Sequence, residues 1–435
     1  MKQMVRTIYP VGCASFFTEE FYDHESGSYF RVIYDCGIGK RQGGKVRLSN
    51  LIDNSFRFGI KGSANFLFLS HFDSDHINGL NLLIEKQYIT KDTISFLPLL
   101  DLAHLDFIEA LVNSRYRAMV LALVRIGSQI VFINNGGANS NLRTENDNNR
   151  EVLNLIFHRD NNPFEFVEPE NDHWQDATDY ISSILNSIKV DVEAERMKYK
   201  DFKIVCNKVE HVQLRIFVQY FDWEYLPFYI QPQWVLDSFY ETVEKEMPGV
   251  ISKISSFPIK WTKDEQKKLK DLYQNHSKDS RYENVKNVTR INMNSMMLLS
   301  QSVVKDLESS IFSNSLFGNF LDLHPIRVDV ATCVYTADVS LSKLSFFVVF
   351  ENFVHKNATN PIGLLQIPHH GSVYCYNQKL FLSPKLKLSC CFVNGDIHST
   401  NPRFEPQILN DSKNYRKLTF IINDFYPLIQ VVDYK

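Results

Sequence analysis

The sequence has no strong charge of either sign. Its 435 residues include 47 Lys and Arg against 50 Asp and Glu, which leaves a formal net charge of -3. A chain so close to neutral has no global attraction to nucleic acid, so any such contact has to come from a local patch.

Paired cysteines are also missing. The seven cysteines are an odd number, and no two of them have the CxxC spacing of redox or zinc-binding motifs. Cys390 and Cys391 are adjacent within an apolar run, which favours two buried thiols over a bridge. This usage predicts a reduced, intracellular protein.

Long apolar runs are absent as well. The N-terminal stretch MKQMVRTIYPVGCASFF lacks the continuous apolar region of a signal peptide. No run reaches the ~20 residues that a membrane-spanning helix needs. We therefore expect a cytoplasmic protein that does not bind the membrane.

What the chain does have is enough apolar sequence for a large core. Hydrophobic residues make up 44% and aromatic residues 13% of it, and its length exceeds one ordinary domain. Short strand-like runs fill residues 1–90 and return in 286–435, where LSFFVVF is one of them, whereas 91–285 has amphipathic, helix-like stretches. These patterns predict an α/β core formed by the two ends, with 91–285 as an inserted, mostly helical region of unknown role.

The densest chemistry lies in FLFLSHFDSDHINGL, residues 66–80. FLFLS is typical of a buried strand, and the apolar pattern after it predicts a helix. Between them lie His71, Asp73, Asp75 and His76, on a short loop at the carboxyl end of the strand. Loops at that end of a strand are where open α/β sheets bind ligands.

Three other predicted strands end in residues of the same kind. VIYDCGIG ends in Asp35, CVYTADVSLS in Asp338, and LLQIPHHGSVY in His369 and His370. Taken singly, an Asp at a strand end is more often a turn or helix cap, and a histidine pair is more often surface. Together they supply the mixed histidines and aspartates that two divalent ions sharing a carboxylate bridge require.

These motifs resemble the metallo-β-lactamase superfamily. SHFDSDH is similar to the family signature HxHxDH, with Asp73 in place of the middle histidine. The HxDxDH form, the TAD strand end and PHHGS, in that order, resemble the nuclease-like domain of the ComEC competence DNA-uptake proteins. The resemblance implies an αββα sandwich with a large, mostly helical insertion. Asn401-Pro402 departs from the His-Pro of the family's C-terminal segment.

The resemblance implies a site for two divalent ions, Zn²⁺ or Mn²⁺. In the family's pattern, His71 and Asp73 hold one ion, Asp75 and His76 hold the other, and Asp338 bridges the two. One residue of the histidine pair completes the second site, and the sequence leaves open which. The implied metal ligands are His71, Asp73, Asp75, His76, Asp338, His369 and His370, and the implied catalytic residues are Asp75, His76 and Asp338.

Further residues have supporting roles by the same resemblance. Asp35 is expected to orient a ligating imidazole from behind, and Gly37 and Gly79 to let backbone segments pass close to the site. Many family members have a separate third histidine in the middle of the chain. His158 and His211 are the candidates for it here.

The implied activity is metal-dependent hydrolysis through a water activated by two metal ions. Three aspartates make the donor set rich in oxygen, which favours Mn²⁺ over Zn²⁺ and a phosphodiester over a lactam. We therefore predict a phosphodiesterase or nuclease that acts on DNA, with defence against foreign DNA as its setting. The alternatives are a hydrolase of small esters, lactones or phosphoesters, and an inactive interaction scaffold.

Some residues are candidates for substrate contact. The basic loop after the Asp35 strand is suited to a phosphate backbone, although an ordinary solvated hairpin explains these residues slightly better. A protein partner, if there is one, would bind the region 91–285. The substrate-binding candidates are Lys40, Arg41, Lys45, Ser372 and His398.

Overall fold

Two mixed β-sheets form the centre of the computed structural model of the chain. The structure describes residues 1–39, 43–54, 62–99, 115–134, 152–157, 166–167, 174–185, 191–199, 202–207, 213–229, 241–250, 262–276, 295–304, 307–313, 326–327, 330–373, 375–395, 406–422 and 427–434.

The first sheet has eleven strands within the described residues. Antiparallel hairpins join β1, β2 and β3, whereas β4, β5, β6 and β10 continue the sheet in parallel. In sheet order the strands are β15 (Ile326–Arg327), β14 (Glu308–Ser313), β20 (Leu428–Asp433), β1 (Lys2–Ile8), β2 (Phe16–Asp23), β3 (Ser28–Cys36), β4 (Phe66–Phe68), β5 (Ile94–Leu99), β6 (Gln129–Asn134), β10 (Ile204–Asn207) and β9 (Trp174–Asp176).

The second sheet has nine strands in the same part of the chain. Strands β16 to β19 run parallel, and β13 joins them antiparallel. In sheet order the strands are β19 (Leu418–Ile422), β18 (Cys390–Asn394), β17 (Leu364–Gln366), β16 (Cys333–Tyr335), β13 (Met297–Ser302), β12 (Trp223–Phe228), β11 (Gln213–Val218), β7 (Val152–Phe157) and β8 (Phe166–Val167).

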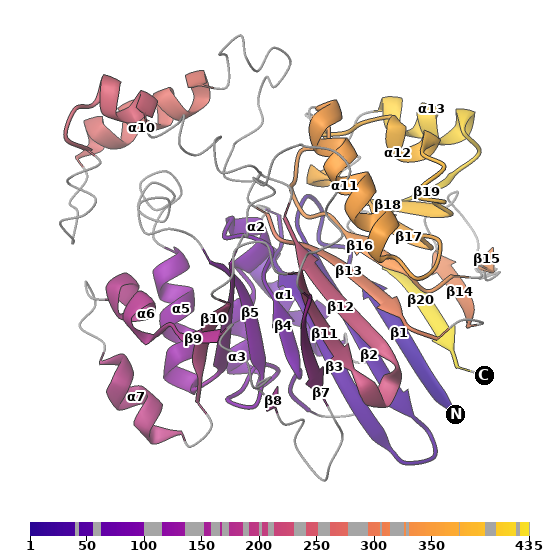
Figure 1. Cartoon of the computed structure of the whole chain (residues 1–435), viewed down its shortest axis with the longest axis horizontal. Coiled ribbons are helices and arrows are strands. Elements are labelled where there is room, and N and C mark those ends of the chain that lie inside the picture. Colours follow the sequence, from indigo (N-terminus) through magenta and orange to yellow (C-terminus); the bar gives the residue numbers. More distant parts are fainter. Residues whose placement is uncertain are drawn as a thin grey trace.

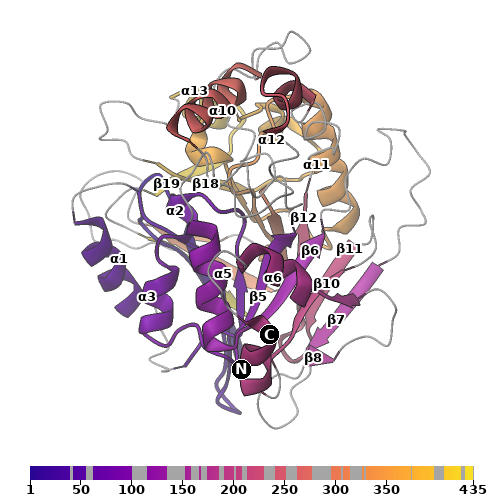
Figure 2. The same cartoon turned by 90° about the vertical axis from the view of Figure 1, so that its left-hand side faces the viewer.

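Helices cover the outer faces of both sheets (Figures 1 and 2). The longer helices are α1 (Gly44–Asp53), α3 (Leu80–Glu85), α5 (Arg115–Ile126), α6 (Thr178–Leu185), α7 (Val192–Lys198), α10 (Lys263–His276), α11 (Leu344–Asn357) and α13 (Pro406–Asn414). The short ones are α2 (Ser74–Ile77), α12 (Lys379–Leu382), η2 (Gln219–Phe221) and η5 (His369–Gly371).

Within the described residues, three hydrophobic cores separate four layers. One core lies between the first sheet and helices α1, α3, α5, α6 and α7, and the second lies between the two sheets. The third joins the second sheet to α11, α12 and α13. The order helix, sheet, sheet, helix agrees with the αββα arrangement expected from the sequence.

Strand β4 shows why the sequence FLFL is apolar without interruption. Phe66 and Phe68 point into the core between the sheets, whereas Leu67 and Leu69 point into the core under the helices. Successive side chains of a strand point to opposite faces, so a strand buried on both faces needs an apolar residue at every position.

The described residues of 91–285 include helices α5, α6, α7 and α10, as the amphipathic pattern predicts, and they also contribute strands β5 to β12 to both sheets. One expectation about secondary structure is wrong. LSFFVVF is not a strand but the start of helix α11, whose Phe346, Phe347, Phe350 and Val354 are buried at helical spacing. Short apolar runs suit either structure until their partners are known. The division of the chain at residues 90 and 285 stays a prediction.

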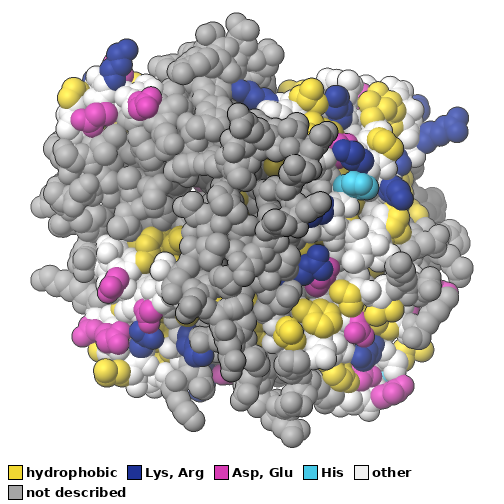
Figure 3. All heavy atoms as spheres, viewed as in Figure 1, with side chains coloured by type: hydrophobic (Ala, Val, Ile, Leu, Met, Phe, Trp, Pro, Cys, Tyr) yellow, Lys and Arg dark blue, Asp and Glu magenta, His cyan; other side chains and the backbone are white. Residues whose placement is uncertain are grey.

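The surface agrees with the near-neutral composition. On the face seen in Figure 3, the described Lys and Arg side chains lie scattered among Asp and Glu rather than in one continuous basic patch.

None of the described helices is long and apolar enough to cross a membrane. Cys390 and Cys391 are buried free thiols, as expected.

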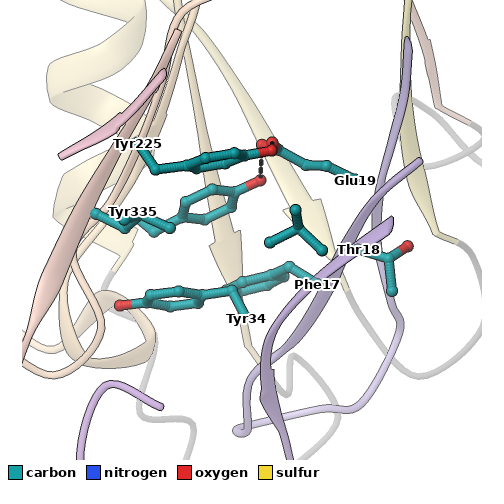
Figure 4. A pocket seen from close by; sticks show the side chains of 8 residues that line it. Phe17, Thr18, Glu19, Tyr34, Tyr225 and Tyr335 are labelled. Carbon is teal, nitrogen blue, oxygen red and sulfur yellow. Dashed lines mark hydrogen bonds between the residues drawn. The ribbon is translucent and has the colours of Figure 1, made fainter. Parts of the chain in front are cut away.

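The core between the sheets contains a buried ion pair. Arg6 Nε lies 2.8 Å from Glu19 Oε1, and both side chains are almost fully buried. The hydroxyls of Tyr225 and Tyr335 both donate to Glu19 at 2.7 Å (Figure 4). Ser300 Oγ donates to the same carboxylate at 2.8 Å. The pair therefore joins both sheets through one carboxylate.

Candidate metal centre

Four of the segments singled out in the sequence meet at one place between the two sheets. Asp35 lies at the end of β3, and the residues from 70 to 77 follow β4, which is parallel to β3. Asp338 follows β16, and His369 and His370 follow the parallel strand β17. All four segments are at carboxyl ends of strands, where parallel neighbours bring their following loops together.

The segment after β4 is a bend followed by one helical turn. The carbonyl of Asp73 accepts hydrogen bonds from the backbone N–H groups of His76 and Ile77, which starts helix α2. The Asp73 side chain does not cap that helix. The ordinary role of an aspartate before a helix is therefore not the one seen here, and its carboxylate faces His71 instead, at 3.8 Å.

Asp35 and Ser70 hold two imidazoles from behind. Asp35 accepts from Ser70 N at 2.8 Å and from Ser70 Oγ at 2.7 Å. The Nδ1 atom of His76 is 2.7 Å from the Oδ2 atom of the same carboxylate, and His71 Nδ1 is 2.9 Å from Ser70 Oγ. Because the hydroxyl proton of Ser70 goes to Asp35, Nδ1 of His71 has to be the donor to Ser70. The Nε2 lone pair of His71 is then left for the centre of the site.

Asp338 divides the histidines into two sets. Its Oδ1 atom is 3.4 Å from Nε2 of His76 and 3.6 Å from Nε2 of His370. Its Oδ2 atom is 3.8 Å from Nε2 of His71 and 3.6 Å from Nε2 of His369. One buried carboxylate thus faces four imidazoles, two at each oxygen, which is the placement of a bridging ligand.

Asp73 and Asp75 form the open side of this cluster. Their side chains are 23% and 24% exposed, whereas those of His71 and Asp338 are 3% exposed. Asp75 lies on the His370 side, with its Oδ2 atom 3.5 Å from His370 Nε2. A ligand from solvent would therefore reach the cluster past these two carboxylates.

The electrostatics of the cluster favour ionised carboxylates and a neutral His71. Burial, together with the neighbouring His76, lowers the pKa of His71 to about 3. Burial would raise the pKa of Asp338, but the surrounding histidines His369, His370 and His76 hold this pKa well below its usual value. Burial also opposes ionisation of Asp75, yet the imidazole of His370, whose Nε2 atom is 3.5 Å from Oδ2, keeps the pKa of Asp75 low.

His76 differs from His71. Burial disfavours the charged imidazolium, yet Asp338 and Asp35 together raise the pKa of His76 well above its usual value. These carboxylates attract positive charge to the position of His76. A cation bound between His76 and Asp338 would be stabilised by the same two carboxylates.

Backbone strain is concentrated at this place. Asp35, Ala337, His369 and His370 have φ angles between 49° and 55°, in the left-handed region. Residues other than glycine rarely adopt this conformation, which costs about 1–2 kcal/mol at each position. Strained backbone kept at several adjoining positions is typical of functional sites.

The donor set fits a divalent metal centre. The Nε2 atoms of His71, His76 and His370 are buried and have no hydrogen-bond partner within the described residues. Two overlapping sets, one of His71, His76 and Asp338 and one of Asp75, His76 and His370, have ligand atoms within 4.8 Å of one another. Buried imidazole nitrogens without partners are costly unless something binds them. These sets have room for one or two ions.

Three residues with supporting contacts were not singled out in the sequence. Ser70 immediately precedes His71 and donates its hydroxyl proton to Asp35. Gln366 Oε1 accepts from the backbone N–H groups of Thr336 and Ala337 at 2.9 Å, which fixes the turn before Asp338. Cys375 Sγ lies 3.0 Å from His369 Nδ1. Gln366 could have been found in the sequence as a polar residue within the apolar run GLLQIP.

The other predicted site residues are less informative. Lys45 is exposed on α1, and Ser372 is half-buried directly after the histidine pair. Lys40, Arg41 and His398 lie outside the described residues, as do the third-histidine candidates His158 and His211 and the Asn401-Pro402 departure. Their roles stay predictions.

Gly37 and Gly79 confirm the expectation of close backbone passage. A Cβ atom at Gly37 would lie 1.8 Å from the carbonyl oxygen of Asp75. At Gly79 it would lie 2.5 Å from Cys36 Sγ. Both contacts are far shorter than real Cβ contacts, so glycine is required at each position.

Gly37→Ala is therefore expected to push α2, and with it Asp75 and His76, away from Asp338. We expect a loss of about 1–3 kcal/mol in the free energy of unfolding, as for other overpacked sites, together with a weaker affinity for metal. Urea unfolding and metal analysis measure the two effects. The control is Gly62→Ala, where the nearest atom is 3.8 Å away in Tyr29. Equal stability of the two variants would contradict the prediction.

Comparison with known proteins adds no assignment. No family model matches the chain, and no curated protein matches it.

Proposed function

We propose that the chain is a metal-dependent phosphodiesterase of the metallo-β-lactamase type, with DNA as its substrate. The observation that carries the proposal is the bridging position of Asp338, which faces four imidazoles from strand-end segments of two sheets. The four-layer arrangement supports it, since the implied family has the same layers. Defence against foreign DNA stays a prediction from the resemblance.

Some of the residues would bind metal, and others would orient the metal-binding side chains. His71 and His76 would bind metal through Nε2, and Asp35 and Ser70 would hold the two rings in the required tautomer and orientation. Two bound divalent ions would lower the pKa of a water between them toward 7 and neutralise charge that develops on a phosphate. Asp338 would keep the two ions at a fixed separation.

The ligand chemistry supports a phosphodiester over a lactam. Asp73, Asp75 and Asp338 contribute three carboxylates, and oxygen donors favour Mn²⁺ or a mixed centre over a centre of Zn²⁺ alone. The two partly exposed carboxylates at the entrance would repel an anionic substrate unless metal neutralises them. Activity should therefore depend on metal for binding as well as for chemistry.

The test compares purified wild type with Asp75→Asn and the control Asp92→Asn, an exposed aspartate in a turn. Each protein is stripped of metal, resupplied with Mn²⁺, Zn²⁺ or Mg²⁺, and incubated with bis-p-nitrophenyl phosphate, double-stranded DNA, single-stranded DNA and RNA. We expect metal-dependent cleavage that falls by about 10²-fold or more in Asp75→Asn, since ~3 kcal/mol of transition-state stabilisation is lost.

The outcomes separate the alternatives. A wild type that binds metal but cleaves no phosphodiester would contradict the proposal and favour a small-molecule hydrolase. A wild type that binds no metal would leave the interaction scaffold. Equal activity of Asp75→Asn and Asp92→Asn would show that the cleavage comes from elsewhere.

A further inference from the structure

The two adjacent histidines of PHHGS do not face the same part of the cluster. His370 Nε2 lies 3.6 Å from Oδ1 of Asp338 and 3.5 Å from Asp75. His369 Nε2 lies 3.6 Å from Oδ2, the oxygen that also faces His71. The left-handed φ angles of both residues turn the chain so that consecutive side chains reach opposite oxygens of one carboxylate.

We propose that the pair is divided between two ions, with His370 completing the half-site of Asp75 and His76, and His369 completing the half-site of His71 and Asp73. The inference rests on the metal centre of the proposed function. It gives the His71 half-site a second histidine, His369, which is directly beside His370 in sequence, so that no histidine is needed from the middle of the chain. Each half-site then has two imidazoles, one terminal carboxylate and one oxygen of Asp338.

Cys375 is the residue that positions His369. Its sulfur lies 3.0 Å from His369 Nδ1, and the cysteine is fully buried. Sulfur accepts weak hydrogen bonds, so an Nδ1–H group directed at Sγ leaves the Nε2 lone pair directed at Oδ2 of Asp338. The backbone supports the same placement, because His369 N donates to Ala337 O at 3.0 Å and thereby ties the pair to the turn that contains Asp338.

His71 has the equivalent support on the other side of the same oxygen. Its Nδ1 atom contacts Ser70 Oγ, which is in turn fixed by Asp35. Both imidazoles that face Oδ2 therefore have a partner at Nδ1 and direct Nε2 to one place. A metal-binding histidine almost always has such a partner at its other ring nitrogen.

The test replaces each histidine of the pair by asparagine, because asparagine tolerates the left-handed conformation that both positions require. Wild type, His369→Asn, His370→Asn and the control His355→Asn, an exposed residue of α11, are loaded with Zn²⁺ alone. Bound zinc per chain is measured after gel filtration. Anomalous scattering from zinc-loaded crystals then shows which position is occupied. Urea unfolding of the metal-free proteins shows whether each variant is folded.

We expect two ions in wild type and in His355→Asn. His369→Asn should lose the ion beside His71 and keep the ion beside Asp75, and His370→Asn should do the reverse. If His369→Asn keeps both ions, or loses the ion beside Asp75, the inference is wrong while the metal centre stands. A wild type with a single ion would overturn the inference together with the two-ion mechanism, and a wild type with none would overturn the metal centre itself.

The role of Cys375 has its own readout. Cys375→Ala should weaken zinc binding at the His71 half-site by about 10- to 100-fold in a chelator competition. Cys375→Ser should restore most of the affinity, because its hydroxyl accepts the same Nδ1–H bond. A purely structural cysteine would give similar losses in both variants, and that result would remove Cys375 from the positioning role.

Discussion

Asp338→Asn is expected to reduce metal-dependent hydrolysis by about 10³-fold or more. Asp338 is buried and has imidazoles at both carboxylate oxygens, so its charge serves both half-sites at once. Asparagine keeps the shape but removes the charge and replaces one oxygen with an N–H donor, which repels a cation. A bound metal supplies several kcal/mol of transition-state stabilisation, and each ~1.36 kcal/mol is a factor of ten in rate.

The same variant should bind no more than one ion per chain. The measurements are the rate on bis-p-nitrophenyl phosphate and metal content after gel filtration. A matched control is Asp411→Asn, a buried aspartate in α13 that accepts a hydrogen bond from Tyr376 at 3.1 Å. This control should keep wild-type activity. If Asp338→Asn retained two ions and more than a tenth of the activity, Asp338 would not be a bridging ligand.

The sequence predicts the strand ends of the site well, and for a physical reason. A strand such as FLFL is apolar on both faces, so the first polar residues after it mark the point where the chain leaves the core. Apolar runs of this kind precede each of the site residues His71, Asp35 and Asp338 and the histidine pair. Neighbouring parallel strands place their carboxyl ends at the same edge of a sheet. Polar residues at the ends of several predicted strands can therefore be expected to meet.

The division of the histidine pair was not predictable in the same way. Adjacent residues in an extended segment point in opposite directions, but which one reaches which oxygen depends on the left-handed turn at His369 and His370. L-residues other than glycine disfavour this turn, so local propensity argues against it. The contacts of His369 with Cys375 and Ala337 support this conformation, and both contacts depend on the folded structure.

The region 91–285 shows the limit of periodicity. WEYLPF forms β12 in the middle of the second sheet, where all six residues are buried. VLNLIF forms β7, which pairs in parallel with β11, a strand far along the chain. Neither run carries information about its partner, and a short apolar run alone suits a buried helix or a strand. Pairing over such a distance is decided by the assembled core.

Breaking the buried ion pair between the sheets should have the largest effect on stability. Arg6 also donates to Tyr335 at 3.0 Å and to the carbonyl of Ala331 at 2.9 Å, so its charge is held by both sheets. Burial alone would lower the pKa of Arg6, but the Glu19 carboxylate raises this pKa. Glu19→Gln keeps the shape of Glu19 but leaves the guanidinium charge uncompensated. We expect a loss of about 3–5 kcal/mol in the free energy of unfolding.

The double variant decides whether the charge or the packing is responsible. Arg6→Met alone should cost as much as Glu19→Gln, because it leaves the carboxylate buried without its cation. Arg6→Met combined with Glu19→Gln should cost less than the sum of the two, since no charge remains and the amide oxygen at position 19 still accepts from one of the two tyrosine hydroxyls, which donate to different oxygens of Glu19. The surface pair Lys86–Asp53, at 2.6 Å but partly exposed, is the control. Asp53→Asn should change the free energy of unfolding by about 1 kcal/mol or less. Strict additivity of the two core substitutions in urea unfolding would mean that Arg6 and Glu19 stabilise the interface of the sheets independently.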